Sequence, residues 1–425
     1  MNWENVFKIM DSYTQYKHYQ ILFEKFRMPK KSSRDEMAKE LQRAVTDQGL
    51  LGTVISEATF SEWLSLHQID GNNYTFVYNL ENSLPEGLLE GLYNNRRQLV
   101  SMRLSEINPD NESEDLQTVM PNLDRVHLSG VHRNEAKETY TFSFVAPCEV
   151  NGSRADGSVR IYKKLFFCHC VFFDNSNDVK IIFNPTTNLL NVNGVKKKKR
   201  SDWSPIADLF FNKIKEIINI NELHIKSPTW IPQSLYQLAE DATSHKNPEI
   251  TEKAFNAQES IESFAMGLLK EAGIDTDNEQ AYVNKFIQDI QFSFEAQLIE
   301  KMGFNEEEDT ITIFKQRSDG VTHIISVEST EEGFKSGLAA QAARRSRQDG
   351  DIDLLGVILK TNERIYKFLV EQGTDAYLIR STNTFVEEEV VNIVIRKLNE
   401  YREQIQAAAA DYSSDSEGTI STQAE

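Results

Sequence analysis

The spacing of apolar and polar residues predicts an α+β chain with several domains. Near the N-terminus, Trp3, Phe7 and Met10 recur at helical intervals, and the segment 74–78 reads as a strand. Further helical stretches surround this strand. Residues 1–106 are therefore expected to form a mixed, mainly helical N-terminal α/β region.

β-structure dominates the pattern in the middle of the chain. The segments 140–145, 159–173 and 179–183 are rich in β-branched and aromatic residues, and Asn-Gly and Asp-Gly turns punctuate them. They predict an antiparallel meander within a β-rich domain, 107–225. Helical spacing then returns, and residues 226–290 are expected to form a helical connector.

The last third of the chain, residues 291–407, predicts a compact α/β domain. It opens on a long helix whose apolar stripe should lie on the following sheet and whose end is marked by Gly303. The next segments read as β-β-α-β-α-β-α, including a helix from Glu363 to Glu371. Residues 408–425 lack apolar periodicity, so we expect them to form a disordered acidic tail.

Composition narrows the class of protein. The 425 residues carry a formal net charge of −19, which argues against a protein that coats nucleic acid through long-range attraction. The first residues do not resemble a signal peptide, no stretch has the roughly 18 apolar residues of a membrane span, and there are three cysteines. We therefore expect a cytoplasmic protein with no membrane partner.

One short cluster, Cys168-His169-Cys170, contains residue types that bind metals. A strand would place both thiols on one face and the imidazole on the other. A four-ligand zinc site needs further cysteine or histidine residues nearby, and the one other thiol in the sequence is Cys148. Buried strand cysteines are therefore the favoured interpretation.

The C-terminal domain carries three features of one known family. They are the helical segment 294–304 (Phe-Glu-Ala-Gln-Leu-Ile-Glu-Lys-Met-Gly-Phe), Asp319-Gly320 at the predicted hairpin, and Val327-Glu328 at the end of the next strand. Together with the order of elements, they resemble the catalytic core of the PD-(D/E)xK nuclease superfamily, especially its Mrr-like restriction endonuclease branch. The resemblance implies a restriction-endonuclease-like fold for residues 291–407.

The chemistry that this resemblance implies is metal-dependent cleavage of a phosphodiester. Two carboxylates hold Mg²⁺ or Mn²⁺, and a lysine activates or orients the attacking water. On the family pattern, Asp319 and Glu328 are the metal ligands and Glu295 assists. Thr330 occupies the position of the family's lysine, and Lys335 is the candidate substitute for that charge.

Two groups of basic residues are candidate nucleic-acid contacts. The first lies on the helix after the predicted hairpin, would face DNA by analogy with the family, and consists of Arg344, Arg345 and Arg347. The second is the basic run at the end of the meander, which contains Lys197, Lys198, Lys199 and Arg200. Solvation at the surface is the alternative interpretation of both groups.

Two functional hypotheses follow. The first is a nucleic-acid-directed protein with a metal-dependent DNA nuclease domain, in the bacterial anti-phage defence setting that the resemblance implies. The alternative is a non-catalytic assembly or sensor protein that uses a degenerate nuclease fold and binds a partner protein through its β-rich domain. Paired copies would suit the symmetry of duplex DNA. The sequence lacks the glycine loops and hydrolase motifs of common small-molecule enzymes.

Overall fold

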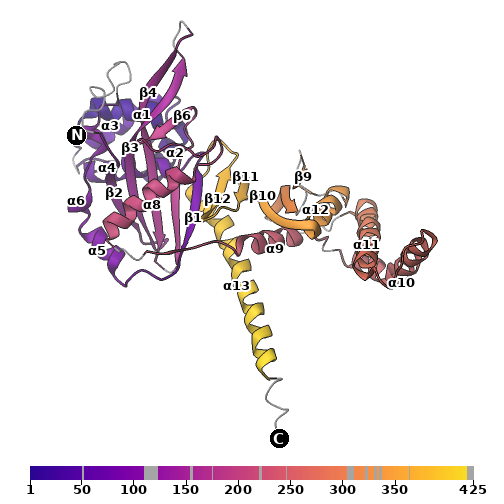
Figure 1. Cartoon of the computed structure of the whole chain (residues 1–425). Coiled ribbons are helices and arrows are strands. Elements are labelled where there is room, and N and C mark those ends of the chain that lie inside the picture. The colour runs from indigo at the N-terminus through magenta and orange to yellow at the C-terminus, as the bar shows by residue number, and fades with distance from the viewer. Residues whose placement is uncertain are drawn as a thin grey trace. The chain divides into compact units, whose positions relative to one another are not determined.

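The chain divides into two units. Figure 1 shows the whole chain coloured by residue number. The computed structural model describes residues 1–49, 52–109, 123–153, 157–174, 176–219, 223–245, 247–303, 311–320, 324–329, 333–334, 337–362 and 364–418. The first unit combines Met1–Pro228 with Gly373–Val391, and the second combines Thr229–Gln372 with Asn392–Glu425. The predicted boundary at 106/107 therefore lies inside one unit.

An antiparallel sheet forms the centre of the first unit. Its strands follow the order β2-β3-β4-β5-β1-β12, so two strands from distant parts of the sequence, β1 and β12, extend the central meander. The meander itself is confirmed, because β3, β4 and β5 are consecutive neighbours. The bounds are β1 (Tyr74–Leu80), β2 (His127–Asn134), β3 (Thr139–Ser153), β4 (Val159–Phe173), β5 (Asp178–Phe183) and β12 (Ala376–Ser381). Two short strands, β6 (Leu189–Val192) and β7 (Ile225–Lys226), pair with β3 and β1.

Two apolar cores cover opposite faces of this sheet. On one face, α8 (Ser204–Ile218) contributes Ile206, Phe210 and Ile214 at helical spacing to a core that also contains Cys168. On the other, the N-terminal helices pack against Phe167. Those helices are α1 (Trp3–Tyr13), α2 (Tyr16–Lys25), α3 (Arg34–Thr46) and α4 (Glu57–Leu66).

Short helical elements connect these parts of the first unit. They are η1 (His67–Ile69), α5 (Leu88–Asn94), α6 (Arg96–Leu99) and η2 (Leu104–Glu106). Side-chain capping fixes the start of two longer helices. Asn2 accepts backbone hydrogen bonds at the start of α1, and Ser33 accepts one from Glu36 at the start of α3.

The second unit contains a four-stranded antiparallel sheet with the order β11-β10-β8-β9. The strands are β8 (Ile311–Gly320), β9 (Ile324–Glu328), β10 (Gly350–Lys360) and β11 (Ile365–Glu371). Two helices, α9 (Ile231–Thr243) and α12 (Gly337–Asp349), contact the sheet. Two further helices, α10 (Pro248–Glu271) and α11 (Gln280–Met302), pack as a pair. The α+β class is confirmed.

Two expectations for the second unit were wrong. The segment predicted as a helix from Glu363 to Glu371 contains strand β11, because Tyr366, Phe368 and Val370 alternate with more exposed residues and are buried against β10. The long helix α11 ends before Gly303 as predicted, where φ is +79°. Its main contacts, however, are with α10 and α12 rather than with the sheet.

The last helix, α13 (Glu388–Gly418), extends into the segment 408–425 for which a disordered tail was predicted. Within this helix the run 407–410 consists of alanine, the residue with the highest helix propensity. Residues 419–425 lie outside the described residues. Within the described part of the chain, no helix is long and apolar enough to cross a membrane.

Candidate functional site

The two predicted metal ligands lie at opposite ends of a β-hairpin. Asp319 on β8 faces Ile324 on β9, whereas Glu328 faces Lys315. Glu328 lies four residue steps along β9 from Ile324, which amounts to about 13 Å. Two oxygens on one Mg²⁺ ion lie only about 3–4 Å apart, because each sits roughly 2.1 Å from the metal. The hairpin therefore does not bring the two carboxylates together.

Each of these carboxylates has a different neighbour. Glu328 forms an ion pair with Lys315, with 2.6 Å between Oε2 and Nζ. Asp319 faces Asp351 of β10, and both carboxylates are exposed. Lys335 and Thr330 lie outside the described residues, so their prediction is untested.

Glu295 of α11, the predicted assisting carboxylate, is held within the helical layer. One carboxylate oxygen lies 2.7 Å from Nε2 of His245, and the other lies 3.1 Å from a guanidinium nitrogen of Arg344. The Glu295 side chain is only 18% exposed. It therefore positions α11 against its neighbours, since both of its oxygens already have partners.

Metal binding at this site does not fit the residues that the structure describes. Among them, no three His, Cys, Asp or Glu side chains are grouped so that they could hold a metal ion. The separation of Asp319 from Glu328 gives the physical reason, because neither carboxylate can reach an ion that the other binds.

The predicted DNA-facing arginines of α12 all bind carboxylates of the same unit. Arg347 is the clearest case, since its side chain is completely buried and binds Glu240, Gln316 and Thr243 at 2.7–2.9 Å. These contacts bury the guanidinium that was predicted to bind a phosphate. Arg344 is 13% exposed and binds Glu295.

Arg345 is the most exposed arginine of the three. Its side chain is 60% exposed and lies 3.1 Å from Asp289 of α11. A surface ion pair of this kind contributes little stability and can exchange partners. Arg345 is thus the one member of the group whose geometry is still compatible with the predicted contact.

Polar side chains around Arg347 form a buried network under the second sheet. Gln316 of β8 accepts a hydrogen bond from Arg347 and donates to Ser346 at 2.7 Å and to the Ala343 carbonyl at 3.0 Å. Burial lowers the pKa of Arg347 from its usual value, although Glu240 opposes this shift. The network fixes α9, α12 and β8 relative to one another.

The basic run of the first unit lies largely exposed. Lys197 places its ammonium 4.4 Å from the centre of the Trp203 ring, and Lys198, Lys199 and Arg200 are exposed. A tight turn follows, in which the Asp202 amide donates to the Lys199 carbonyl. This geometry leaves the prediction of phosphate binding open.

The Cys168-His169-Cys170 cluster is confirmed as part of a buried strand. Both thiols belong to the core under α8, and burial raises their pKa well above the usual value. His169 points to the other face, where Nδ1 lies 3.0 Å from the Ser143 hydroxyl. The cluster therefore packs the sheet and does not converge on a metal.

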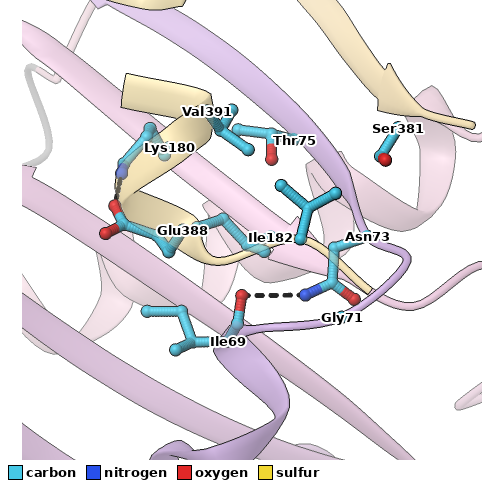
Figure 2. A pocket seen from close by; sticks show the side chains of 10 residues that line it. Ile69, Gly71, Asn73, Thr75, Lys180, Ile182, Ser381, Glu388 and Val391 are labelled. Atoms are coloured by element: carbon cyan, nitrogen blue, oxygen red, sulfur yellow. Dashed lines mark hydrogen bonds and ion pairs between the residues drawn. The ribbon is translucent and has the colours of Figure 1, made fainter. Parts of the chain in front are cut away.

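A buried lysine in the first unit was missed by the sequence analysis. Lys180 of β5 is completely buried and forms an ion pair with Glu388, whose side chain is 11% exposed. Figure 2 shows the two side chains meeting beside a small cavity that Thr75, Ser381 and other residues line. Burial lowers the pKa of Lys180 well below its usual value.

The size of this cavity limits its chemistry. Its space for a ligand is about 10 Å³, which is close to the minimum for a single water molecule. An organic substrate does not fit. The pair is therefore a structural contact at the first turn of α13. The sequence analysis did not single out Lys180, although a charged residue between Val179 and Ile181 of a strand is itself a signal.

Backbone contacts hold the same turn of α13 in place. A carboxylate oxygen of Asp70 accepts a hydrogen bond from the Glu388 amide at 2.8 Å, which caps the helix. Gly71 and Val386 exchange two backbone hydrogen bonds of 2.9 and 3.1 Å. Figure 2 also shows Asn73 donating to the carbonyl of Ile69 in the loop beneath. The segment before α13 is thus fixed to the first unit.

The second unit contains a larger cleft, of about 560 Å³. This volume falls within the usual range of ligand sites. Its walls come from α9, the end of α12, the start of β10 and α13, and include Gln233, Tyr236, Gln237, Arg347, Gln348 and Asp351. Tyr401 of α13 donates to Asp241 of α9 at 2.6 Å and so fixes one wall.

Comparison with known proteins assigns no relative to this chain. No family model matches the sequence, and neither the curated proteins nor the solved structures gave a match.

Proposed function

We propose that this chain is a non-catalytic partner-binding protein, an assembly or sensor component whose second unit serves as a binding scaffold. The observation that carries the proposal is that residues predicted to bind metal and DNA form ion pairs within the second unit instead. Arg347 is completely buried against Glu240, and Glu328 is paired with Lys315. Both groups are used in contacts within the second unit, which supports a role in the fold rather than in catalysis.

The cleft of the second unit supports the binding part of this proposal. Its volume of about 560 Å³ contrasts with the cavity of about 10 Å³ beside Lys180. Exposed amide side chains and an exposed carboxylate surround it. Such groups donate and accept hydrogen bonds, which suits recognition of a polar segment of another protein.

A nuclease assay tests the non-catalytic part. Full-length protein is incubated with supercoiled and linear DNA in Mg²⁺ or Mn²⁺, beside Asp319→Ala and Glu328→Ala. We expect no metal-dependent cleavage above a buffer control from any of the three proteins. Cleavage by the wild type that both substitutions abolish would establish the nuclease function instead, while cleavage that survives both would indicate a contaminant.

Two binding measurements complete the test. Calorimetric titration with Mn²⁺ should give no specific heat, because Asp319 and Glu328 do not share an ion. Fluorescence anisotropy with duplex DNA at low salt should show no binding through the α12 arginines, so Arg345→Ala should match the wild type. Salt-sensitive binding that Arg345→Ala weakens would contradict the proposal.

A further inference from the structure

We propose that the first unit binds single-stranded nucleic acid on a basic surface of its central sheet. This surface consists of the run 196–200 together with Tyr162 and Lys164 of β4. The inference goes beyond the proposed function, because it concerns the other unit and another class of partner. Three observations carry it: the path of the run across the sheet, cations that have no ion-pair partner among the described residues, and an aromatic ring beside them.

Alternation along β4 places Tyr162 and Lys164 on the face of the sheet that α8 covers. β4 pairs with β3 along its whole length without a register shift, so its even-numbered residues share one face. Phe166 belongs to the core under α8, and Tyr162 packs against the same core. Leu165 belongs to the core on the opposite face. Lys164 therefore projects from the α8 side.

The segment that carries the basic run crosses this face. At its start, Val192 of β6 lies in one row with Cys148 of β3 and Lys164 of β4. At its end, Trp203 packs 5.9 Å from Phe183 of β5, on the far side of β4. Val192 and Trp203 both belong to the core under α8, so the chain passes over β3 and β4 on that face. Strands lie about 4.8 Å apart, which puts the start of the segment roughly 10 Å from Lys164.

Five cations of this surface are exposed and form no ion pair within the described residues. They are Lys164, Lys196, Lys198, Lys199 and Arg200. Of the carboxylates nearby, Glu149 of β3 projects from the opposite face, and Asp202 accepts hydrogen bonds from the amide and hydroxyl of Ser204. The local excess of charge is therefore positive despite the net charge of −19, and it attracts phosphate over about 10 Å.

Tyr162 supplies a planar surface beside these cations. Its half-buried ring lies against Gly152 of β3, where a Cβ would lie 2.4 Å from a ring carbon, so this packing requires glycine. The guanidinium carbon of Arg160 lies 5.2 Å from the centre of the ring. Nucleic-acid bases stack on tyrosine rings and guanidinium planes whatever their sequence. The platform favours a single strand, because the bases of a duplex already stack on one another.

Apolar residues at the end of β4 argue against a membrane as the partner. Val159 is 73% exposed and Ile161 is 45% exposed, and their odd-numbered positions face away from the basic run. Binding at a bilayer surface uses apolar side chains and cations that meet the lipid together. Their separation on two faces favours a polymer of phosphates and bases.

Labelled oligonucleotides test the inference on the full-length protein by fluorescence anisotropy. The probes are an oligothymidylate, an abasic phosphodiester strand of the same length and a duplex of that length. We expect the oligothymidylate to bind most tightly at low salt. The abasic strand offers phosphates without bases and should bind more weakly. Binding should weaken as salt rises, because phosphate contacts release counterions.

Substitutions separate the charge from the ring. Lys198→Gln with Lys199→Gln should weaken binding of both single strands about tenfold. It should also lower the slope of log affinity against log salt by about 1.4, since each phosphate contact contributes about 0.7. Tyr162→Ala should weaken oligothymidylate binding about tenfold and leave the abasic strand unaffected, which also shows that the fold is intact. Tyr162→Phe keeps the ring and should bind as the wild type does.

A charge-matched variant provides the control. Lys17→Gln with Lys39→Gln removes two exposed lysines from the N-terminal helices and changes the net charge equally. It should bind the oligothymidylate as the wild type does. An equal loss in this variant, no binding of either single strand at low salt, or tighter binding of the duplex would overturn the proposed surface. So would binding to phosphatidylserine vesicles without binding to oligonucleotides, which would assign these cations to a membrane.

Discussion

Three histidines of the first unit are buried in their neutral form. Burial lowers the pKa of His18 to about 4 and that of His169 to about 3, and it lowers the pKa of His67 well below its usual value. Within the described residues, Nε2 of His67 and Nε2 of His169 have no hydrogen-bond partner. A protonated ring would carry an N–H at Nε2, and no described group accepts a hydrogen bond from it.

We expect acid to destabilise this unit. Below about pH 6.5 the unfolded chain binds protons at these histidines while the folded chain does not, so stability falls as pH decreases toward the folded pKa values. Each histidine costs about 1.4 kcal/mol per pH unit in this window. Urea unfolding between pH 7 and 4.5 measures the effect, and a midpoint that does not change would contradict it.

One carboxyl group works in the opposite direction. The pKa of Asp70 is raised to about 7, mainly by burial and also by Glu387. Between pH 7 and the unfolded pKa near 3.8, the folded state binds one more proton at Asp70 than the unfolded state does. Asp70 therefore makes the folded state more stable as pH falls. Because three histidines lose stability as pH falls and only Asp70 gains it, the net effect of acid on the folded state is destabilising. Replacing His169 by Gln should therefore make the unfolding midpoint less sensitive to acid.

Arg347 gives a second prediction for a single residue. Arg347→Met should destabilise the second unit by about 3 kcal/mol, because Glu240 and the buried Gln316 lose their partner. Arg345→Met is the matched control on the same helix, and its side chain is 60% exposed. It should change the urea midpoint little. Equal effects of the two substitutions would show that the buried network contributes nothing.

Residue types alone predicted some of these sites and not others. The alternation of a strand correctly placed Cys168 and His169 on opposite faces. Asp319 and Glu328 do not lie opposite each other because an antiparallel hairpin brings together only residues equally distant from its turn, and Asp319 lies next to the turn. Burial of Arg347 was beyond prediction, since it depends on Glu240, more than a hundred residues away along the chain.

At the level of elements, the buried ion pair of Lys180 with Glu388 adds to the backbone contacts that hold the first turn of α13. Glu388→Gln should destabilise the first unit by about 3–5 kcal/mol, because it leaves Lys180 buried without its counter-charge. The double substitution Lys180→Met with Glu388→Leu should recover most of that loss. Hydrogen exchange of residues 386–391 provides the measurement, with faster exchange expected only in the single variant.

A neighbouring glutamate provides the control for this experiment. Glu389 is 47% exposed and pairs with the partly exposed Lys137. Glu389→Gln should leave exchange in this turn close to that of the wild type, since solvent replaces the lost partner. If it loosens the turn as much as Glu388→Gln does, then burial of the Lys180 pair is not what holds α13.

Most elements could be predicted because their periodicity is strong. The prediction for residues 363–371 was wrong because the periodicity there is weak. The meander β3-β4-β5 and strand β10 have long runs of β-branched and aromatic residues. Residues 365–371 are too few to distinguish a strand from a short helix by composition, and pairing with β10 decides the outcome. Tertiary contacts also decide where α11 lies. Its apolar positions show that one side is covered, but they do not show which element covers it.

At the scale of the whole molecule, the first unit is discontinuous in sequence. A fragment of residues 1–228 lacks β12, which pairs with β1 and contributes Ala376 and Leu378 to the core. We expect this fragment to melt at a lower temperature than the unit in the full chain. Adding a synthetic peptide of residues 373–391 should raise the melting temperature, as a ligand stabilises the state that it binds.

A variant peptide makes that test specific. Leu378→Asp would place a charge in the apolar core, so the altered peptide should not stabilise the fragment. No effect of either peptide would show that β12 is dispensable, and an equal rise with both would show that burial of Leu378 is not what stabilises the fragment. The predicted domains 1–106, 107–225, 226–290 and 291–407 follow the chain in order, because local patterns cannot reveal that β12 returns to β1.

The position of β12 late in the sequence also affects how the first unit folds during synthesis. During synthesis, roughly 145 residues follow Pro228 before Gly373 emerges, which takes about 7–30 s at typical translation rates. Throughout that interval the edge of β1 and part of the apolar core stay uncovered on the nascent chain. The protein thus passes through a period in which a chaperone, or another nascent copy, competes with its own last strand for the same edge.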